Sequence, residues 1–421
     1  MATGFLRKIV TLSSGIAVGQ GVLLLFTPVL SRIYTPADFG LFGILVALAS
    51  ILAVGSNGRY FLAIVQPEDD DEASSVLALA VAATGLFAAA VAVALAVGRP
   101  LVASLLHNPG FGPWWWWVPV ATVLAGWFDA VNYWHIRRQR YGLVSRVQPV
   151  RAGVLVGGQA GLGALGAGFA GLAWGRLVAD FVLLVGLLPR LRRDLQALRS
   201  WRHPATWIVM ARRFREFPQY SAPQGWLSAV AQYLPVLVLA VVLDNVVVGM
   251  FLMTQRILAT PNQFLGKALR QVFYQQLHQG PRRHDDDRRF WWRTTRAILL
   301  WALAPTLAIV VFGPPLFTMA LGPQWTLAGQ FARPVVVWQL LAMACIPSQM
   351  LLMAQGRQRT HLVIEVIFLA VRFVALVVGA RLGGALGAVT WFSLVGALMQ
   401  AVIIAAAARR PGAATPEAAR A

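Results

Sequence analysis

Uninterrupted apolar stretches limit what this chain can fold into more than any other feature of its sequence. Residues 76–97 contain no charged side chain, and about 20 apolar residues suffice for a helix to cross the ~30 Å hydrocarbon layer of a membrane. Similar runs recur along the chain, so we predict an all-α integral membrane protein with about twelve transmembrane helices. The expected spans are 9–31, 39–58, 75–98, 115–134, 149–168, 170–189, 222–243, 246–265, 294–313, 331–353, 360–380 and 385–408.

The composition argues against a soluble protein. The 421 residues are 58% hydrophobic and only 12% charged, with a mean hydropathy of +0.65. Soluble domains are nearer 45–50% apolar and about 25% charged. A soluble core could not hide this much apolar surface, so lipid must cover part of it.

The net charge of +20 is distributed as in a membrane protein. The arginines gather in the connections between apolar runs, above all after the fourth and sixth predicted helices. A nucleic-acid-binding groove would need a continuous basic face, so we expect no nucleic-acid partner. The outer ends carry only Arg32, Arg99, Arg176, Arg333 and Arg381. Because Lys and Arg concentrate in cytoplasmic loops, we expect a multi-pass protein with both termini in the cytoplasm.

The basic segment 190–217 divides the predicted helices into two sets of six. We therefore expect an N-terminal six-helix lobe at 1–189, a basic cytoplasmic linker at 190–217, a C-terminal six-helix lobe at 218–408 and a cytoplasmic tail at 409–421. The halves are weakly alike, since the sequence FGLF at 39–42 has a counterpart in VGMF at 248–251. Such repeats, with a site between them, are common in transporters.

Catalytic and metal-binding patterns are absent from the sequence. There is no G-x-x-x-x-G-K-[ST] loop and no H-E-x-x-H motif, and the six histidines show no ligand spacing. The single cysteine, Cys345, permits no intrachain disulfide. The acidic runs 68–72 and 285–287 are interpreted as solvated charges rather than a cation site. We therefore predict no enzymatic activity, no cofactor and no metal.

Arginines within or at the ends of predicted helices are the first candidates for a binding site. A charged side chain near mid-membrane costs about 2.5–3.5 kcal/mol on insertion scales. Arg256 lies about two turns into its predicted helix, with no carboxylate at helical spacing on that helix. Arg32 and Arg59 end the first two helices, where an interfacial, snorkelling arginine is the alternative interpretation. Guanidinium groups bind phosphate oxygens in bidentate fashion, so these arginines predict an anionic, phosphorylated substrate.

Five further ionisable residues are candidates for ion coupling or for pairing within the membrane. Arg176 and Asp180 are four residues apart, which favours an ion pair on one helix. Glu365 and Arg372 are seven apart and share a helical face. Asp129 has no obvious local partner and is a possible proton or cation site.

Several stretches resemble the bacterial polysaccharide-biosynthesis flippases, the O-antigen (Wzx-type) translocases. The resemblance is carried by PVLSRIYTPADFGLF at 28–42, and by Arg59-Tyr60 followed by LAIVQP at 62–67 and an acidic run. In the second half it is carried by residues 244–249 and by TQRIL at 254–258. The resemblance extends along the whole chain in layout and is most specific in the first 75 residues and at 244–277.

This resemblance implies membership of the multidrug/oligosaccharidyl-lipid/polysaccharide (MOP) exporter superfamily, with two six-helix lobes around a central cavity. It implies an undecaprenyl pyrophosphate-linked oligosaccharide as substrate, flipped from the inner to the outer leaflet of the bacterial cytoplasmic membrane. In the related lipid II flippases, arginines at similar places engage the pyrophosphate. The resemblance therefore implies that Arg32, Arg59 and Arg256 bind the pyrophosphate here. The lipid bilayer is the other partner implied, and a polysaccharide polymerase and export machinery are further candidates.

Four alternatives remain open at this point. A multidrug and toxin extrusion pump would favour cationic drugs and carboxylates in its cavity. A lipid II flippase would be expected to have fourteen helices rather than twelve. A membrane-embedded polymerase would need a large outer loop with catalytic polar residues, and a scaffold would have lost transport altogether.

Overall fold

The chain is helical throughout the part that the structure describes. The computed structural model describes residues 14–409 except 16, 106–108, 278–283 and 356, and these residues contain no strand. Seven of the described helices are long and apolar enough to cross a membrane. The predicted all-α membrane fold is therefore confirmed. The predicted tail from 410 onward and the start of the first predicted span lie outside the described residues.

The helices fall into two compact units, Met1–Leu252 and Met253–Ala421. The first unit contains α2 (Thr27–Ile33), α3 (Pro36–Gly55), η1 (Tyr60–Val65), α4 (Asp70–Leu105), η2 (Pro109–Trp114), α5 (Trp117–Arg137), α6 (Tyr141–Ala164), α7 (Phe169–Gln196), η3 (Ser200–Arg202), α8 (Pro204–Arg213), the π-helical turn η4 (Phe217–Ser221) and α9 (Ala222–Val242). The helix α10 (Asn245–Leu277) begins in this unit and continues into the second, which also holds α11 (His284–Leu321), η5 (Pro323–Trp325), α12 (Thr326–Ala354) and α13 (Gln358–Ala408).

The unit boundary differs from the predicted lobe boundary at 190–217. Helix α9 belongs to the first unit because it packs against α3. The segment 190–217 is itself largely helical, since it holds the end of α7, η3 and α8. The division into six-helix lobes at 1–189 and 218–408 stays a prediction.

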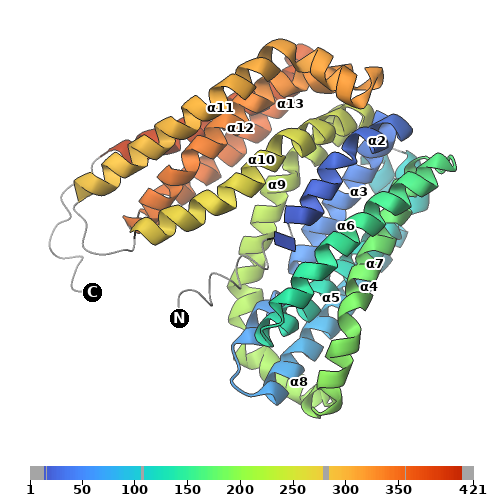
Figure 1. The fold of residues 1–421 in the computed structure, drawn as a ribbon. Helices are drawn as coiled ribbons and strands as arrows, with labels where there is room; N and C mark the ends of the chain where they lie inside the picture. Colours follow the sequence, from blue (N-terminus) through green and yellow to red (C-terminus); the bar gives the residue numbers. More distant parts are fainter. Residues whose placement is uncertain (1–13, 16, 106–108, 278–283, 356, 410–421) are drawn as a thin grey trace. The chain divides into compact units, whose positions relative to one another are not determined.

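The helices of the first unit are drawn from blue to yellow-green in Figure 1 and run side by side. The packed pairs include α4 with α5, α6 with α7, and α3 with both α5 and α9. Large aromatic residues fill this core and satisfy their polar atoms on neighbouring helices, as buried Tyr and Trp usually do. Tyr34 Oη donates to the Gln159 carbonyl at 2.5 Å, and Trp117 Nε1 donates to the Ala173 carbonyl at 3.0 Å.

The first turns of α3 and α10 meet through two glycines. A Cβ on Gly40 would lie 1.8 Å from the Asn245 carbonyl oxygen, and a Cβ on Gly249 would lie 1.9 Å from the Pro36 carbonyl oxygen. Gly40 is four residues after Pro36, and Gly249 is four residues after Asn245, so the two contacts are equivalent. Both helices are also capped just before these turns, by Thr35 with Asp38 in α3 and by Asp244 Oδ1 accepting from the Val247 amide at 2.8 Å in α10. The weak similarity between FGLF and VGMF therefore reflects two equivalent helix starts packed reciprocally.

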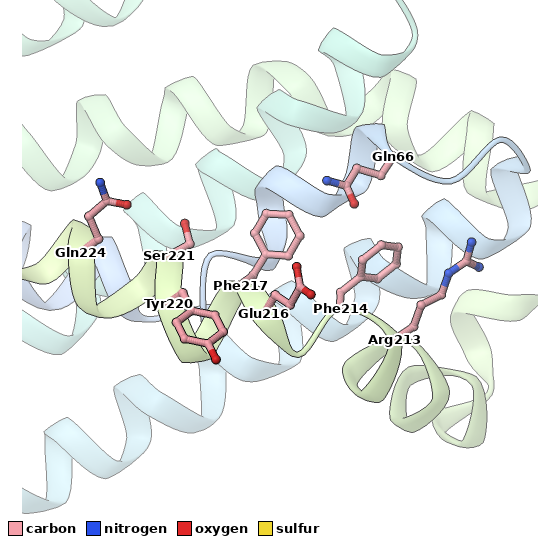
Figure 2. Close-up of a pocket in the computed structure, with 8 residues that line it drawn as sticks. All are labelled: Gln66, Arg213, Phe214, Glu216, Phe217, Tyr220, Ser221 and Gln224. Atoms are coloured by element: carbon pink, nitrogen blue, oxygen red, sulfur yellow. The ribbon is translucent and has the colours of Figure 1, made fainter. Parts of the chain in front are cut away.

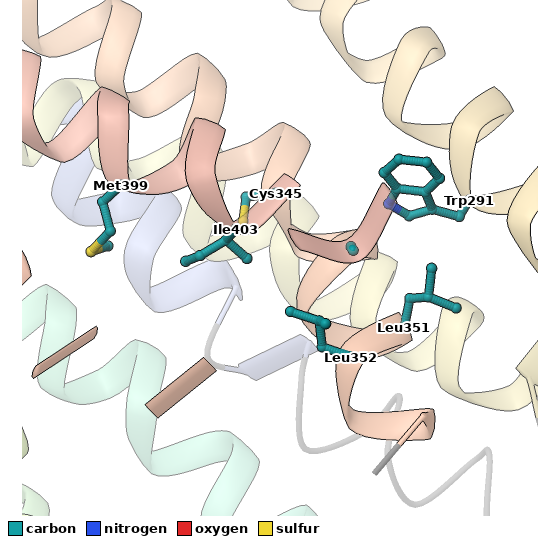
Figure 3. Packing of buried hydrophobic residues seen from close by; sticks show 7 residues of the cluster. Trp291, Cys345, Leu351, Leu352, Met399 and Ile403 are labelled. Atoms are coloured by element: carbon teal, nitrogen blue, oxygen red, sulfur yellow. The ribbon is translucent and has the colours of Figure 1, made fainter. Parts of the chain in front are cut away.

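The second unit is built around α11, α12 and α13, which pack in sequence order. Figure 3 shows part of its core, where Trp291 of α11 lies with Cys345 of α12 and Ile403 of α13 among buried residues. Trp291 Nε1 donates to Ser348 Oγ at 2.8 Å, which satisfies the indole within the apolar cluster.

Helix α13 covers both of the last two predicted spans because it folds back on itself. The helical backbone is interrupted at Gly383 and Gly384, and Gly384 has φ +57° and ψ −143°, a conformation almost restricted to glycine. The two arms then approach so closely that a Cβ on Gly379 would lie 2.6 Å from the Gly387 carbonyl oxygen. Small residues allow this contact, and the two predicted spans are confirmed as two arms of one hairpin.

Candidate functional site

Arg59 lies in a tight turn between α3 and η1. Gly58 and Arg59 both have φ +57°, a left-handed conformation that is uncommon for a residue with a side chain. Two backbone hydrogen bonds stabilise the turn. The Gly58 amide donates to the Gly55 carbonyl at 2.9 Å, and the Tyr60 amide donates to the Asn57 carbonyl at 3.1 Å. Such strain persists where the surroundings determine the backbone, and it is often found at functional positions.

The Arg59 guanidinium rests on α9. Its Nη1 donates to the Ser221 carbonyl at 3.3 Å, and its Cζ lies 5.9 Å from the centre of the Phe61 ring. Gly225 makes room for the group, because a Cβ there would lie 2.6 Å from Arg59 Nη1. Nε is buried and has no hydrogen-bond partner among the described residues. Part of the hydrogen-bonding capacity of this cation, which has five N–H donors, is therefore not used by the described residues.

Asp129 and Tyr133 of α5 complete the surroundings of this arginine. Asp129 is close enough for its charge to act on Arg59, but in the part of the chain that the structure describes the two side chains form no direct ion pair. Tyr133 packs edge-on against Phe61, with ring centroids 4.9 Å apart. The arrangement provides Arg59 with a nearby counter-charge that does not pair with it directly.

Substituting Gly225 with alanine should displace the Arg59 guanidinium and press on Val54. The added Cβ would meet Nη1 at 2.6 Å, which is the movable end of a side chain, and Val54 Cγ1 at 2.9 Å. One hydrogen bond to a charged group contributes about 1.5–3 kcal/mol, so we expect the transport predicted from the sequence to fall about tenfold. The matched control is Gly153→Ala on α6, where a Cβ meets nothing within 4 Å. Equal export by the two variants would contradict the role assigned to this contact.

A pocket of about 510 Å³ opens beside Ser221, the residue that accepts from Arg59. It is lined by Gln66, Arg213, Phe214, Glu216, Phe217, Tyr220, Ser221 and Gln224. Figure 2 shows Gln66 reaching in from the segment after η1, while the other side chains come from the end of α8, the connection that includes η4, and the start of α9. Arg59 and this pocket therefore share Ser221, the last residue of η4, as a neighbour.

The predicted arginines are not all brought together. Arg32 is exposed in the last turn of α2, just before α3, whereas Arg59 follows the other end of α3. Because α3 has 20 residues and a helix rises 1.5 Å per residue, about 30 Å separates these ends. Arg256 is half-buried on α10 in the second unit. Roles for Arg32 and Arg256 in substrate binding stay predictions.

Asp180 lies between two arginines. Arg176 Nε is 2.6 Å from Asp180 Oδ2, as the spacing of four predicts, and Arg151 Nη2 of α6 is 2.6 Å from Oδ1. Arg151 could not be predicted as a partner, because it lies 29 residues before Asp180 and on another helix. The three side chains form a largely buried network of net charge +1.

Glu365 and Arg372 have different neighbours. Glu365 Oε1 lies 3.6 Å from His361 Nε2. Arg372 is held between two aromatic rings, with Cζ 4.3 Å from the Trp338 ring and 4.2 Å from the Phe392 ring. Cation–π contacts of this kind compensate part of the cost of a cation away from water.

The acidic run 68–72 lies at the start of α4, where it is partly exposed and also pairs with basic side chains from other helices. Asp70 lies 3.0 Å from Arg137 Nε and 2.8 Å from Arg138 Nη1, and Glu72 lies 2.7 Å from Arg213 Nη1. These ion pairs fix the basic connections at this end of the first unit. Among the described residues, no group of three or more His, Cys, Asp or Glu side chains could hold a metal ion.

Comparisons with known proteins agree on the class of this fold. A family model described as "Polysaccharide biosynthesis protein" matches residues 29–329. A multidrug resistance MATE family transporter of the MOP superfamily, in an inward-facing conformation, is 14% identical with a TM-score of 0.65, covering 95% of this chain and 97% of that one. The lipid II flippase MurJ, in an inward closed conformation, is 9% identical with a TM-score of 0.70, covering 96% of this chain and 88% of that one.

A third solved structure is a MOP superfamily transporter from Pyrococcus furiosus, whose binding pocket is described as having reverse polarity. It is 14% identical with a TM-score of 0.57, covering 95% of this chain and 94% of that one. No curated protein matches the chain. The fold is that of the MOP superfamily transporters, and the family match covers most of the sequence. The chain therefore belongs to the polysaccharide biosynthesis protein family.

Proposed function

We propose that this protein flips a polyprenyl pyrophosphate-linked oligosaccharide, of the undecaprenyl type, from the inner to the outer leaflet of the bacterial cytoplasmic membrane. The observation that carries the proposal is the Arg59 guanidinium, held by Ser221 and Gly225 with Nε buried and without a partner in the described part of the chain. Arginine is the side chain best suited to bidentate phosphate binding. Membership of the polysaccharide biosynthesis family supports a pyrophosphate-linked glycan over other anions.

The physical task fits a transporter and requires no catalysis. A pyrophosphate and its sugars cannot enter hydrocarbon unaided, because each charge buried without a partner costs several kcal/mol. The polyprenyl tail can remain in lipid throughout. The protein therefore has to supply a polar path for the head group only, and Arg59 with its neighbouring carboxylate Asp129 is a suitable part of that path.

The orientation follows from charge. The connections bearing Arg137, Arg138, Arg140 and Arg213 lie at one end of the first unit, and basic connections stay in the cytoplasm. We infer from this charge bias that this end of the first unit faces the cytoplasm, with the Ser221 pocket opening towards the inner leaflet, where the substrate is made, and we propose that both termini are cytoplasmic as well. A polysaccharide polymerase and export machinery would then receive the glycan on the outer side.

A multidrug extrusion pump is the competing function, and Asp129 is the observation in its favour. Pumps of this kind use carboxylates to bind cationic drugs or coupling ions. Arg59 argues against it, since its positive charge lies close enough to act on Asp129 and would repel a cationic drug. Drug susceptibility of cells lacking the protein separates the two proposals.

The decisive experiment measures lipid-linked oligosaccharide in cells that lack this protein. We expect the intermediate to accumulate on the inner face and surface polymer to disappear, with recovery on complementation by wild type. Arg59→Ala should reduce surface polymer by at least tenfold, because charged hydrogen bonds contribute about 1.5–3 kcal/mol each. Arg99→Ala is the control, since Arg99 is exposed near the far end of α4. The variants Arg32→Ala and Arg256→Ala test the two remaining candidates in the same assay. Normal surface polymer without the protein would overturn the proposal.

A further inference from the structure

We propose that the pocket beside Ser221 binds carbohydrate, namely the sugar attached directly to the pyrophosphate of the substrate. This inference rests on the proposed function and adds a recognition site to it. The pocket combines three aromatic rings with two primary amides, a carboxylate, a guanidinium and a hydroxyl. Sugars present apolar C–H faces and edges of hydroxyl groups, so rings and planar polar groups at one place suit them. Its volume of about 510 Å³ is typical of small-ligand sites.

The polar side chains of the pocket are available for a ligand. Within the described residues, the side chains of Gln66, Glu216 and Gln224 make no hydrogen bond. An amide offers two donors and an acceptor, and a carboxylate offers acceptors only. Together the three groups can satisfy hydroxyls that both donate and accept, as every sugar hydroxyl does.

Two of the three aromatic rings in the pocket are already held by packing. Phe214 is buried, with 8% of its surface exposed, and its ring packs edge-on against Phe217 with centroids 6.3 Å apart. Arg213 lies over the Phe214 ring at 5.4 Å and is tied to Glu72 at 2.7 Å. A ligand therefore meets a preformed wall, which lowers the ordering cost of binding.

The backbone of the pocket is also unusual. Phe217–Ser221 forms a π-helical turn, a rare conformation that occurs frequently at functional sites. This turn carries Phe217, Tyr220 and Ser221 to the pocket (Figure 2).

Position gives the strongest argument for a sugar. Ser221 lines the pocket, and its carbonyl accepts from Arg59 Nη1 at 3.3 Å. In a polyprenyl pyrophosphate glycan the first sugar is bonded directly to the phosphate. Arg59 does not itself line the pocket, so the proposal requires that the sugar extend from a phosphate at Arg59 past Ser221 to the pocket mouth.

The alternative interpretation is that the aromatic residues anchor the protein at the membrane interface, as Tyr and Trp commonly do. Tyr220 is 74% exposed, which is compatible with either role. An anchor requires no amides, however, and its removal would leave sugar binding unchanged. The two interpretations therefore predict different outcomes for the amide variants.

The test uses the purified full chain in phosphatidylglycerol–phosphatidylcholine nanodiscs, without sugar-based detergent. Saturation-transfer NMR measures binding of glucose, galactose, N-acetylglucosamine and N-acetylgalactosamine 1-phosphates, with glycerol 1-phosphate as the probe that has phosphate but no sugar. We expect at least one sugar phosphate to bind more tightly than glycerol 1-phosphate. The double variant Gln66→Ala/Gln224→Ala should weaken that binding about tenfold, through the loss of two or more hydrogen bonds. Gln219→Ala is the matched control, because Gln219 lies on the same turn, is exposed and does not line the pocket.

Three results would overturn the carbohydrate site. These are equal binding of sugar and glycerol phosphates, binding unaffected by the double variant, and no binding of any probe by protein that is monodisperse on size exclusion. None of them bears on the flippase proposal, which is decided separately by the Arg59 variants and the lipid-linked intermediate in cells. If Arg59→Ala loses polymer export while the amide variants bind sugar as wild type does, the flippase proposal stands and the carbohydrate site is rejected.

Discussion

Replacing Asp180 with asparagine is expected to destabilise the protein by about 3–5 kcal/mol, the usual cost of breaking a buried ion pair from one side. Asp180 Oδ1 is 2.6 Å from Arg151 Nη2, and Oδ2 is 2.6 Å from Arg176 Nε. Its side chain is only 13% exposed. Asparagine removes the negative charge and leaves two guanidinium groups facing each other. Thermal unfolding in detergent and the folded fraction on size exclusion measure the loss.

The control removes the whole network. Replacing a buried ionic triad with apolar residues of similar volume is often neutral or stabilising, so Asp180→Leu/Arg151→Met/Arg176→Met should regain the stability that Asp180→Asn loses. Export by the triple variant then separates two roles for Asp180. A folded variant that exports normally shows a structural network, whereas a folded variant without export shows that these charges take part in transport. Unchanged stability of Asp180→Asn would show that the network contributes nothing to the fold.

The Asp180 network shows which parts of a site can be predicted from sequence. Arg176 and Asp180 could be paired in advance because helical geometry brings positions four apart to the same face. Arg151 could not, since its contact depends on how α6 packs against α7. The same limit applies to Arg59: its unusual neighbours Ser221 and Gly225 lie more than 160 residues away, and only the packing of α9 on α3 brings them together.

The helices themselves were predictable because the thickness of the hydrocarbon layer sets the length of an apolar span. The ends of the helices were less predictable. Helix α4 is 36 residues long, because the thickness of the hydrocarbon layer does not determine how far a helix continues into water. The helix α8 within the basic linker was missed because it is amphipathic and short. The α13 hairpin was predicted only as two spans, without the close contact of Gly379 with Gly387.

Valine at position 40 or 249 is expected to destabilise the protein by about 3 kcal/mol, the upper part of the range for overpacking a close contact. The added Cβ would lie 1.8 Å from the Asn245 carbonyl oxygen in one case and 1.9 Å from the Pro36 carbonyl oxygen in the other. Both obstacles are backbone atoms in capped helical turns, so α3 and α10 must move apart. Unfolding in detergent measures the effect, and Gly85→Val on α4, where a Cβ meets nothing within 4 Å, is the control.

The double variant tests whether the two glycines belong to one contact. Substitutions at sites in direct contact are not additive, and here each valine would separate the same two helices. Once the first has done so, the second meets less resistance, and the loss in Gly40→Val/Gly249→Val should be clearly smaller than the sum of the single losses. Strict additivity would mean that each glycine tolerates its own neighbour independently. In that case the similarity of 39–42 to 248–251 would reflect two separate helix starts rather than one reciprocal packing contact.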